Sequence, residues 1–343
     1  LQRVAVMCTD GITRTVNVDK SLNYPAGWMV RIDVTPEGEN VTAIENRTIS
    51  GTVSADATML GNRKLADDVQ ILDTTTEGVA GTVRPSRLSG TKLNMLNVRY
   101  YTLNDNGEID RLILNDVTGD LWKYGVLDDI RNIAANLPST KTPATAGDSE
   151  GEGSDGTTQV LKDLRSVLVP TTSEILWGVI NGDILQTVWN KVTSSTGSLV
   201  SIGVKQLAKV VGEPYGTILN YVGGGATYVC YINGQPTSYT TSIKYPVLAG
   251  GLAVRQEVNG SVKAMIQLMP MKIDKVGAAS VLSGSTRYEV ADNAQVYLWY
   301  KGQYYATKLA EVNSDDYYLT GWYDNFGCAA GKRVRVIVAV KKD

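Results

Sequence analysis

Residues 65–71, with the sequence Leu-Ala-Asp-Asp-Val-Gln-Ile, have a counterpart in residues 290–296, with the sequence Val-Ala-Asp-Asn-Ala-Gln-Val. A second pair of stretches, 26–34 and 250–258, matches in the same order along the chain. A third pair follows them, formed by Asp105-Asn106 with residues 111–114 and by Asp324-Asn325 with residues 335–338. Three matched blocks at a nearly constant offset predict a duplicated structural module.

The duplication divides the chain into a first β-module at 1–117, a region at 118–225, and a second β-module at 226–343 that repeats the first. Short apolar runs separated by Gly, Asn and Asp predict that each module is a small β-barrel or sandwich. The predicted strands of the first module are 4–8, 12–18, 28–34, 41–44, 49–53, 69–72, 79–83, 98–103 and 109–114. Those of the second module are 228–232, 252–258, 262–268, 296–300, 304–307, 317–323 and 334–340.

The region between the modules has a different composition. Residues 138–158 contain Pro, Thr, Ser, Gly and acidic side chains, so we expect a mobile linker that cannot bury enough apolar surface to offset its ordering entropy. After the linker, apolar residues recur with helical spacing in 161–168, 173–189 and 204–222. The predicted fold class is therefore mainly β with an α-helical insert, whose stripe at 175–189 packs within the chain or binds a partner.

Charge and hydropathy exclude several partners. The 343 residues carry a formal net charge of −2 and no clustered basic face, so no nucleic-acid binding is expected. The basic residues Lys332-Arg333, Arg335 and Lys341-Lys342 flank an apolar strand, and we expect them to keep its edge soluble. No run of 18 apolar residues occurs, so the sequence predicts no membrane span.

The chain contains no histidine, which excludes a Ser-His-Asp catalytic triad and most zinc and haem sites. The motifs G-x-S-x-G, Walker A, H-E-x-x-H and paired C-x-x-C do not occur. We therefore expect no enzyme, no cofactor and no metal site. A glycosidase that uses only carboxylates is the remaining catalytic alternative.

Three cysteines, Cys8, Cys230 and Cys328, are too few and too far apart for a disulfide framework, and at least one must be unpaired. Their redox state stays open at this point. Because the sequence starts at Leu1 and not at Met, we expect a mature or trimmed fragment of a longer protein.

Several local patterns have competing interpretations. Residues 151–156 match G-x-G-x-x-G, but they are acidic and follow no strand, which favours a linker over a nucleotide site. The oxygen-rich stretch 104–110 is typical of a hairpin turn, with calcium as the alternative. The pairs Asp67-Asp68 and Asp315-Asp316 are expected on the surface. Three N-x-[ST] triplets begin at Asn40, Asn46 and Asn259 and matter only in a glycosylating pathway.

The aromatic residues of the second module are the best candidate for a ligand site. The chain has one Phe but 18 Tyr and six Trp, and many of them gather near its end. They either pack in the core and at sheet edges or form a platform for sugar rings. The gathered rings are Trp299, Tyr300, Tyr304, Tyr305, Tyr317, Tyr318, Trp322 and Tyr323. The candidate saccharide-binding residues are Trp299, Tyr300, Tyr304, Tyr305, Trp322 and Tyr323.

Residues 64–72, 107–109 and 112–120 of the first module resemble β-rich modules of S-layer homology domain proteins from Gram-positive, clostridial-type bacteria. So do residues 321–325 and 332–338 of the second module. The resemblance covers about two thirds of the chain and carries no catalytic motif. The S-layer homology repeats themselves, which anchor such proteins, have no match in this sequence.

The resemblance implies export and an extracellular location at the cell wall of a Gram-positive bacterium. It also implies that cell-wall polysaccharide or neighbouring envelope proteins bind through parts outside this fragment. The expected function is a non-catalytic structural spacer of a cell-envelope, S-layer-like protein. The alternative is a carbohydrate-binding module that uses the aromatics of the second β-module.

Overall fold

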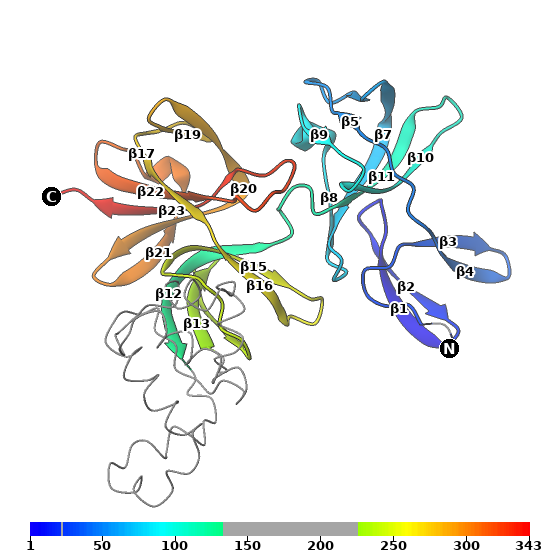
Figure 1. The fold of residues 1–343 in the computed structure, drawn as a ribbon, viewed down its shortest axis with the longest axis horizontal. Coiled ribbons are helices and arrows are strands. Elements are labelled where there is room, and N and C mark those ends of the chain that lie inside the picture. The colour runs from blue at the N-terminus through cyan, green and yellow to red at the C-terminus, as the bar shows by residue number, and fades with distance from the viewer. Residues whose placement is uncertain (22, 133–225) are drawn as a thin grey trace, which may run out of the picture. The chain divides into compact units, whose positions relative to one another are not determined.

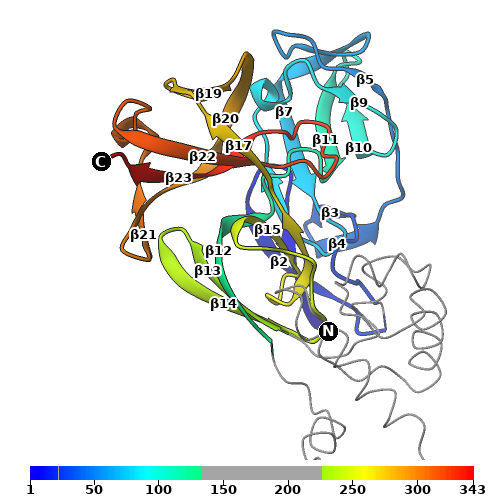
Figure 2. The same ribbon diagram turned by 60° about the vertical axis from the view of Figure 1, so that its left-hand side comes forward.

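The computed structural model describes residues 1–21, 23–132 and 226–343, and these residues form a nearly all-β fold (Figures 1 and 2). Contacts divide the chain into two compact units. The described residues of the first are 1–21, 23–125, 253–264 and 268–343, and those of the second are 126–132, 226–252 and 265–267. The predicted mobile linker at 138–158 and the predicted helices at 161–222 lie outside the described residues.

The chain begins with two separate hairpins. One consists of β1 (Gln2–Met7) and β2 (Thr13–Val18), and the other of β3 (Val30–Thr35) and β4 (Gly38–Ala43). The first hairpin turns at Gly11, whose φ of 86° lies in the left-handed region that glycine adopts without steric cost. The predicted strands 4–8, 12–18, 28–34 and 41–44 correspond to these four strands, with bounds that differ by a few residues.

The next sheet is built around one long strand, β7 (Arg63–Thr74). Its strand order is β10-β11-β7-β6, with β8 also paired to β7, and Figure 1 shows it in cyan. The shorter elements are β5 (Gly51–Thr52), β6 (Met59–Leu60), β8 (Ala80–Thr82), the 3₁₀ helix η1 (Pro85–Leu88), β9 (Lys92–Leu93), β10 (Val98–Leu103) and β11 (Ile109–Asn115). The sheet curls as a half-barrel around a core that includes Ile71, Leu112 and Leu114, all buried.

A five-stranded sheet follows, with the strand order β14-β13-β12-β15-β16. Its strands are β12 (Lys123–Asn132), β13 (Ala226–Ile232), β14 (Gln235–Thr241), β15 (Gly250–Gln256) and β16 (Val262–Gln267). Burial alternates strictly along β13, as expected for a strand with one buried face. Strand β12 lies in the region that the sequence analysis assigned to the linker and insert.

The C-terminal sheet is built around a second long strand, β20 (Thr286–Tyr300). Its strand order is β17-β22-β23-β20-β19-β18, with β21 also paired to β20 (Figure 2). The other elements are β17 (Met269–Ile273), β18 (Lys275–Val276), β19 (Ser280–Ser283), β21 (Gln303–Thr307), the 3₁₀ helix η3 (Leu309–Glu311), β22 (Tyr317–Tyr323) and β23 (Val334–Lys341). Val296, Ile337 and Leu319 lie in its buried core.

In the first of these curled sheets, β7 and β11 pair in parallel with a break in register. Ile109 lies opposite Leu65, and Arg111 lies opposite Gln70. Strand β7 therefore advances five residues while β11 advances two. The antiparallel ladder between β10 and β11 also breaks at this point, so Asp110 lies at a β-bulge.

The C-terminal sheet has a parallel pair of strands with a register break of the same size. Val334 lies opposite Val290, and Val336 lies opposite Gln295, so β20 advances five residues while β23 advances two. The antiparallel ladder between β22 and β23 breaks between Val334 and Val336. Arg335 is the residue at this second bulge, at the place that Asp110 occupies in the other sheet.

Candidate functional site

Among the described residues, Arg335 is the largest side chain that is fully buried, with 0% of it exposed. Its backbone belongs to the bulge of β23, and a bulge turns a side chain away from the direction that strand alternation would give it. A buried guanidinium needs hydrogen-bond acceptors for its N–H groups and a countercharge. The expectation that Arg335 keeps a strand edge soluble was therefore wrong.

Four hydrogen bonds satisfy the Arg335 guanidinium. Nε donates to Oδ1 of the buried Asp324 at 2.8 Å, and Nη1 donates to Oδ1 of Asp120 at 2.7 Å. Nη1 also donates to Oδ1 of Asn293 at 2.9 Å, and Nη2 donates to the carbonyl of Thr118 at 2.8 Å. These partners come from three separate places in the sequence, so one side chain joins three segments of the chain.

The charges of this network act on one another. Burial opposes a charged Arg335, but Tyr124, Asp324 and Asp120 outweigh it and raise its pKa. Burial also opposes ionisation of Asp120, while hydrogen bonds from Arg87 and Arg335 hold its pKa below the usual range. The guanidinium carbon lies 4.7 Å from the centroid of the Tyr124 ring, a cation–π distance. Both pKa shifts favour the charged forms of Arg335 and Asp120 at neutral pH.

A second arginine, Arg87 of η1, also binds Thr118 and Asp120. Its Nε donates to Oδ2 of Asp120 at 3.0 Å, and its Nη2 donates to the Thr118 carbonyl at 2.9 Å. Its Nη1 donates to the carbonyl of Ala330 at 2.8 Å, and the Ala330 amide donates to the carbonyl of Val117. Figure 1 shows the loop between β22 and β23, which contains Ala330, reaching this segment.

Asp73, at the end of β7, fixes the segment from its other end. Its carboxylate is buried and accepts hydrogen bonds from the amides of Val117 and Thr118, both at 3.0 Å. The Thr118 hydroxyl donates to the same carboxylate at 2.7 Å. Residues 116–120, which leave β11, are thus held by side chains of β7, η1 and β23. We name these residues the clasp segment.

The polar contacts of the clasp segment are structural. Each charged group described above is engaged by an opposite charge or by backbone groups, so none is available as a free acid, base or nucleophile. Cys328, which lies nearby, has its pKa raised by burial and by the carboxylates of Asp116, Asp324 and Asp73. A raised pKa disfavours the reactive thiolate.

The predicted saccharide residues of β20 and β21 are brought together in part. Trp299 lies directly opposite Tyr304 across the hairpin, so their side chains share one face. Tyr300 pairs with Gln303, and Tyr305 pairs with Leu298, which places these two rings on the opposite face. The exposed fractions are 42% for Trp299, 59% for Tyr300 and 48% for Tyr305.

The predicted residues of β22 lie apart from this hairpin, because β23 separates β22 from β20. Trp322 pairs with Pro270 and Val336, and Tyr323 packs against the ring of Tyr288 with 5.0 Å between centroids. Both are only partly exposed. The six predicted residues therefore form at least two separate groups and no single coplanar platform.

Sequence reasoning missed the side chains that build the clasp. Asp324 was noted only as part of a repeated block, and Asp73 and Asp120 were not singled out. The bulge that turns Arg335 inward depends on two ladders at once, and no local pattern in the sequence reveals it. One signal was available, namely a lone arginine inside the apolar run 334–340.

The other predicted sites have simple outcomes. Of the stretch 104–110, residues 104–108 form the turn between β10 and β11, where Oδ1 of Asn104 accepts hydrogen bonds from the amides of Asn106 and Glu108. Asp67 and Asp68 are exposed on β7. Within the described part of the chain, no group of three Cys, Asp or Glu side chains is placed to hold a metal ion. The G-x-G-x-x-G stretch at 151–156 lies outside that part.

All three cysteines are free thiols, with Cys230 buried and the other two partly exposed. Over residues 1–21, 23–132 and 226–343, no helix is long and apolar enough to cross a membrane. Comparison of the chain with protein-family models, with curated proteins and with solved structures gives no match.

Proposed function

We propose that this chain is a non-catalytic scaffold, in which curled β-sheets act as rigid spacers. The observation that carries the proposal is the clasp segment, which Arg335, Arg87 and Asp73 hold from three separate elements. A buried arginine that satisfies four acceptors specifies one arrangement, because any other arrangement leaves charges buried and unpaired. Such a lock suits a protein that must keep its shape under load.

We further propose that the two curled sheets descend from one duplicated module. Their parallel pairs break register in the same way, five residues against two, at the positions where the sequence blocks 65–71 and 290–296 match. In both sheets a 3₁₀ helix follows the short strand that pairs with the long one. The register aligns Arg111 with Val336, one residue away from the alignment that the sequence suggested.

The setting that we propose is the envelope of a Gram-positive bacterium, with export of the protein and anchoring through other parts of it. Its support is the resemblance of residues 64–72 and 332–338 to modules of S-layer homology domain proteins. Fractionation of the source cells, with an antibody raised against this chain, tests the location. Recovery in the cytosolic fraction alone contradicts it.

Hydrogen exchange of the intact chain tests the scaffold itself. We expect the amides of Val117 and Thr118 to exchange as slowly as those of the central strand β23, because both amides are bound to the buried Asp73. Exchange of these two amides within seconds, with β23 still protected, would show a flexible joint and contradict a rigid spacer.

Carbohydrate binding is the second candidate function, favoured by one observation. Trp299 and Tyr304 stand side by side on the β20–β21 hairpin, and Trp299 is substantially exposed. Paired rings of this kind stack on sugar faces. Glycan titration of Trp299→Ala tests it, with Tyr318→Ala as the control because Tyr318 is an exposed aromatic on a different strand. Equal affinities for both variants contradict the hairpin site.

A further inference from the structure

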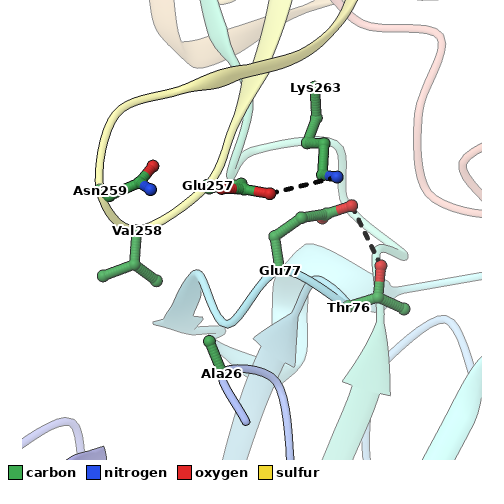
Figure 3. Close-up of a pocket in the computed structure, with 7 residues that line it drawn as sticks. All are labelled: Ala26, Thr76, Glu77, Glu257, Val258, Asn259 and Lys263. Atoms are coloured by element: carbon green, nitrogen blue, oxygen red, sulfur yellow. Dashed lines mark hydrogen bonds and ion pairs between the residues drawn. The ribbon is translucent and has the colours of Figure 1, made fainter.

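A pocket of about 610 Å³ lies at the turn that follows β7. Its wall contains Thr76 and Glu77 from this turn, and side chains from the hairpin of β15 and β16. Figure 3 shows these side chains around the pocket. The volume falls within the range of about 300–1,000 Å³ that is typical of small-molecule sites.

Glu77 is the unusual side chain of this pocket, because only 9% of it is exposed. One carboxylate oxygen, Oε1, accepts a hydrogen bond from the Thr76 hydroxyl at 3.1 Å and lies 3.2 Å from Nη2 of Arg255. The other oxygen, Oε2, is buried and has no hydrogen-bond partner in the described part of the chain. Nε of the paired Arg255 is likewise buried without a hydrogen-bond partner in the described residues, so this ion pair leaves one acceptor and one donor unsatisfied. Unsatisfied buried polar groups are costly, and a ligand group that both donates and accepts a hydrogen bond would satisfy them.

The backbone holds Glu77 in place. Gly78, next to it, has a φ of 92°, and a Cβ at this position would meet the Gly27 amide nitrogen at 3.0 Å. A Cβ at Gly27 would lie 2.1 Å from the carbonyl oxygen of Thr76. Two glycines that allow two backbone segments to touch leave the turn little freedom to move Glu77 toward another partner.

The charges around the pocket balance. Glu77 is paired with Arg255, and at the rim Glu257 is paired with Nζ of Lys263 at 3.1 Å. Two acids and two bases leave no net charge to attract a cation or an anion. The side chain of Asn259 adds an amide, whose Oδ1 already accepts a hydrogen bond from the Ser261 amide. The wall therefore offers both hydrogen-bond donors and acceptors in a setting without net charge.

We infer that this pocket binds a neutral, polyhydroxylated ligand, with the chemistry of a sugar, through a hydroxyl that donates to Oε2 of Glu77. A hydroxyl is both a donor and an acceptor, so a ring that carries several hydroxyls matches the mixed wall of the pocket. An ammonium ligand would meet Arg255 and Lys263, and an anion would meet the two glutamates. This site is distinct from the aromatic hairpin of β20 and β21 and does not depend on the scaffold proposal.

Titration calorimetry on the intact chain tests the inference with three neutral probes, methyl α-glucoside, methyl α-mannoside and N-acetylglucosamine. Butylamine and inorganic phosphate serve as charged probes. We expect saturable binding of at least one neutral probe, with a Kd on the order of 1 mM, as is usual for a ligand of this size. Glu77→Gln removes the carboxylate and should raise this Kd at least about tenfold.

Two further variants separate the site from the fold. Val258 is 67% exposed at the pocket wall, so Val258→Trp fills the pocket while the Glu77–Arg255 pair stays intact, and it should also abolish binding. Asp292→Asn makes the same kind of charge change at an exposed position and should leave the Kd unchanged. Circular dichroism confirms that each variant is folded.

Three results would overturn the inference. The first is no binding of any neutral probe at about 50 mM, some fifty times the expected Kd. The second is binding of butylamine or phosphate alone. The third is sugar binding that survives Glu77→Gln and Val258→Trp but is lost in Trp299→Ala, which would assign it to the aromatic hairpin. None of these results affects the hydrogen-exchange test of the scaffold.

Discussion

The two curled sheets share the same register break and bulge, but the residue at the bulge has a different role in each. At the bulge of β11 the residue is Asp110, which accepts a hydrogen bond from the hydroxyl of its neighbour Thr102 and stays partly exposed. At the bulge of β23 the residue is Arg335, which is fully buried and binds the clasp segment. One backbone irregularity thus gives a local surface contact in one sheet and a long-range lock in the other.

A second matched position differs in the opposite sense. Asp73 of β7 lies opposite Leu114, and Leu298 of β20 lies opposite Ala339, so the registers place Asp73 and Leu298 at corresponding points. The first sheet uses a buried carboxylate there to hold the amides that follow β11. The second has an apolar side chain packed against its core. Each sheet therefore contributes a different half of the clasp.

Removing the buried arginine should give the largest effect. Arg335→Met leaves Asp324, only 1% exposed, without its countercharge, and we expect the free energy of unfolding to fall by about 3–5 kcal/mol. The matched change Asp110→Asn, at a partly exposed bulge residue, should cost less than about 1 kcal/mol. Urea unfolding of the intact chain measures both.

Equal losses in the two variants would contradict the contrast between the bulges. A double variant, Arg335→Met with Asp324→Asn, sharpens the test. Removing the stranded charge should recover part of the lost stability, because much of the single-variant cost is the unpaired carboxylate. No recovery would mean that the arginine acts mainly through packing.

The next largest effect is expected from truncating matched core residues of the two sheets. Ile71 and Val296 occupy corresponding positions and are 2% and 6% exposed. Ile71→Ala should lower the free energy of unfolding by about 2–5 kcal/mol, and Val296→Ala by about 1 kcal/mol less, since it removes one methylene fewer. Thermal unfolding followed by circular dichroism gives both values.

The number of unfolding transitions is as informative as their midpoints. Because the clasp segment joins β7, η1 and β23 within one compact unit, each variant should shift a single transition. Two separate transitions, each moved by only one of the variants, would show that the two sheets unfold independently.

Acid should reduce the stability that Asp120 contributes through the clasp segment. The hydrogen bonds from Arg87 and Arg335 lower its folded-state pKa below the unfolded value of about 3.9. The stability from this group is therefore complete above about pH 4 and is lost as the pH falls through the folded pKa. Asp120 is 40% exposed, so we expect about 1 kcal/mol.

The variant Asp120→Asn lacks this pH-dependent contribution. Its deficit relative to the parent protein should be complete at pH 7 and should shrink as the pH falls below about 4. Urea unfolding at a series of pH values from neutral to acid measures it. A deficit that stays constant across the series would mean that the Asp120 charge does not bind the clasp.

Much of the strand pattern was predictable from the sequence. The bounds 98–103 and 317–323 agree with β10 and β22, because alternating apolar residues mark both strands. The long strands were cut short, since the exposed pair Asp67-Asp68 interrupts the apolar pattern of β7. Two-residue strands such as β9 give no periodic signal, and β12 was not predicted as a strand.

The candidate site was less predictable, for a physical reason. The burial of Arg335 follows from a break in two ladders that join strands far apart in the sequence. Its partners Thr118 and Asp120 lie more than two hundred residues earlier in the chain. Local patterns report neighbours within one strand or turn, so they indicate neither fact. The aromatic cluster was visible in composition, but the division of its faces required the register.

The smallest predicted effect concerns the points where the two central strands end. After β11 the chain enters a left-handed turn at Asp116, with a φ of 45°, whereas β23 continues through Lys341 at the corresponding point. Burial raises the pKa of Asp116, and the hydrogen bond from Nε1 of Trp122 opposes the shift without cancelling it. This carboxylate therefore costs stability as the pH rises through its folded pKa.

Asp116→Asn should remove that cost. Asparagine adopts left-handed backbone more readily than most residues, and its Oδ1 still accepts from Trp122. We expect a gain of about 0.5 kcal/mol at pH 7 that disappears in acid, where the parent carboxyl is protonated. Urea unfolding at pH 7 and pH 4 measures the difference. A loss of stability at pH 7 would mean that the charge itself holds the turn, and the first sheet would then depend on a carboxylate at both ends of its clasp segment.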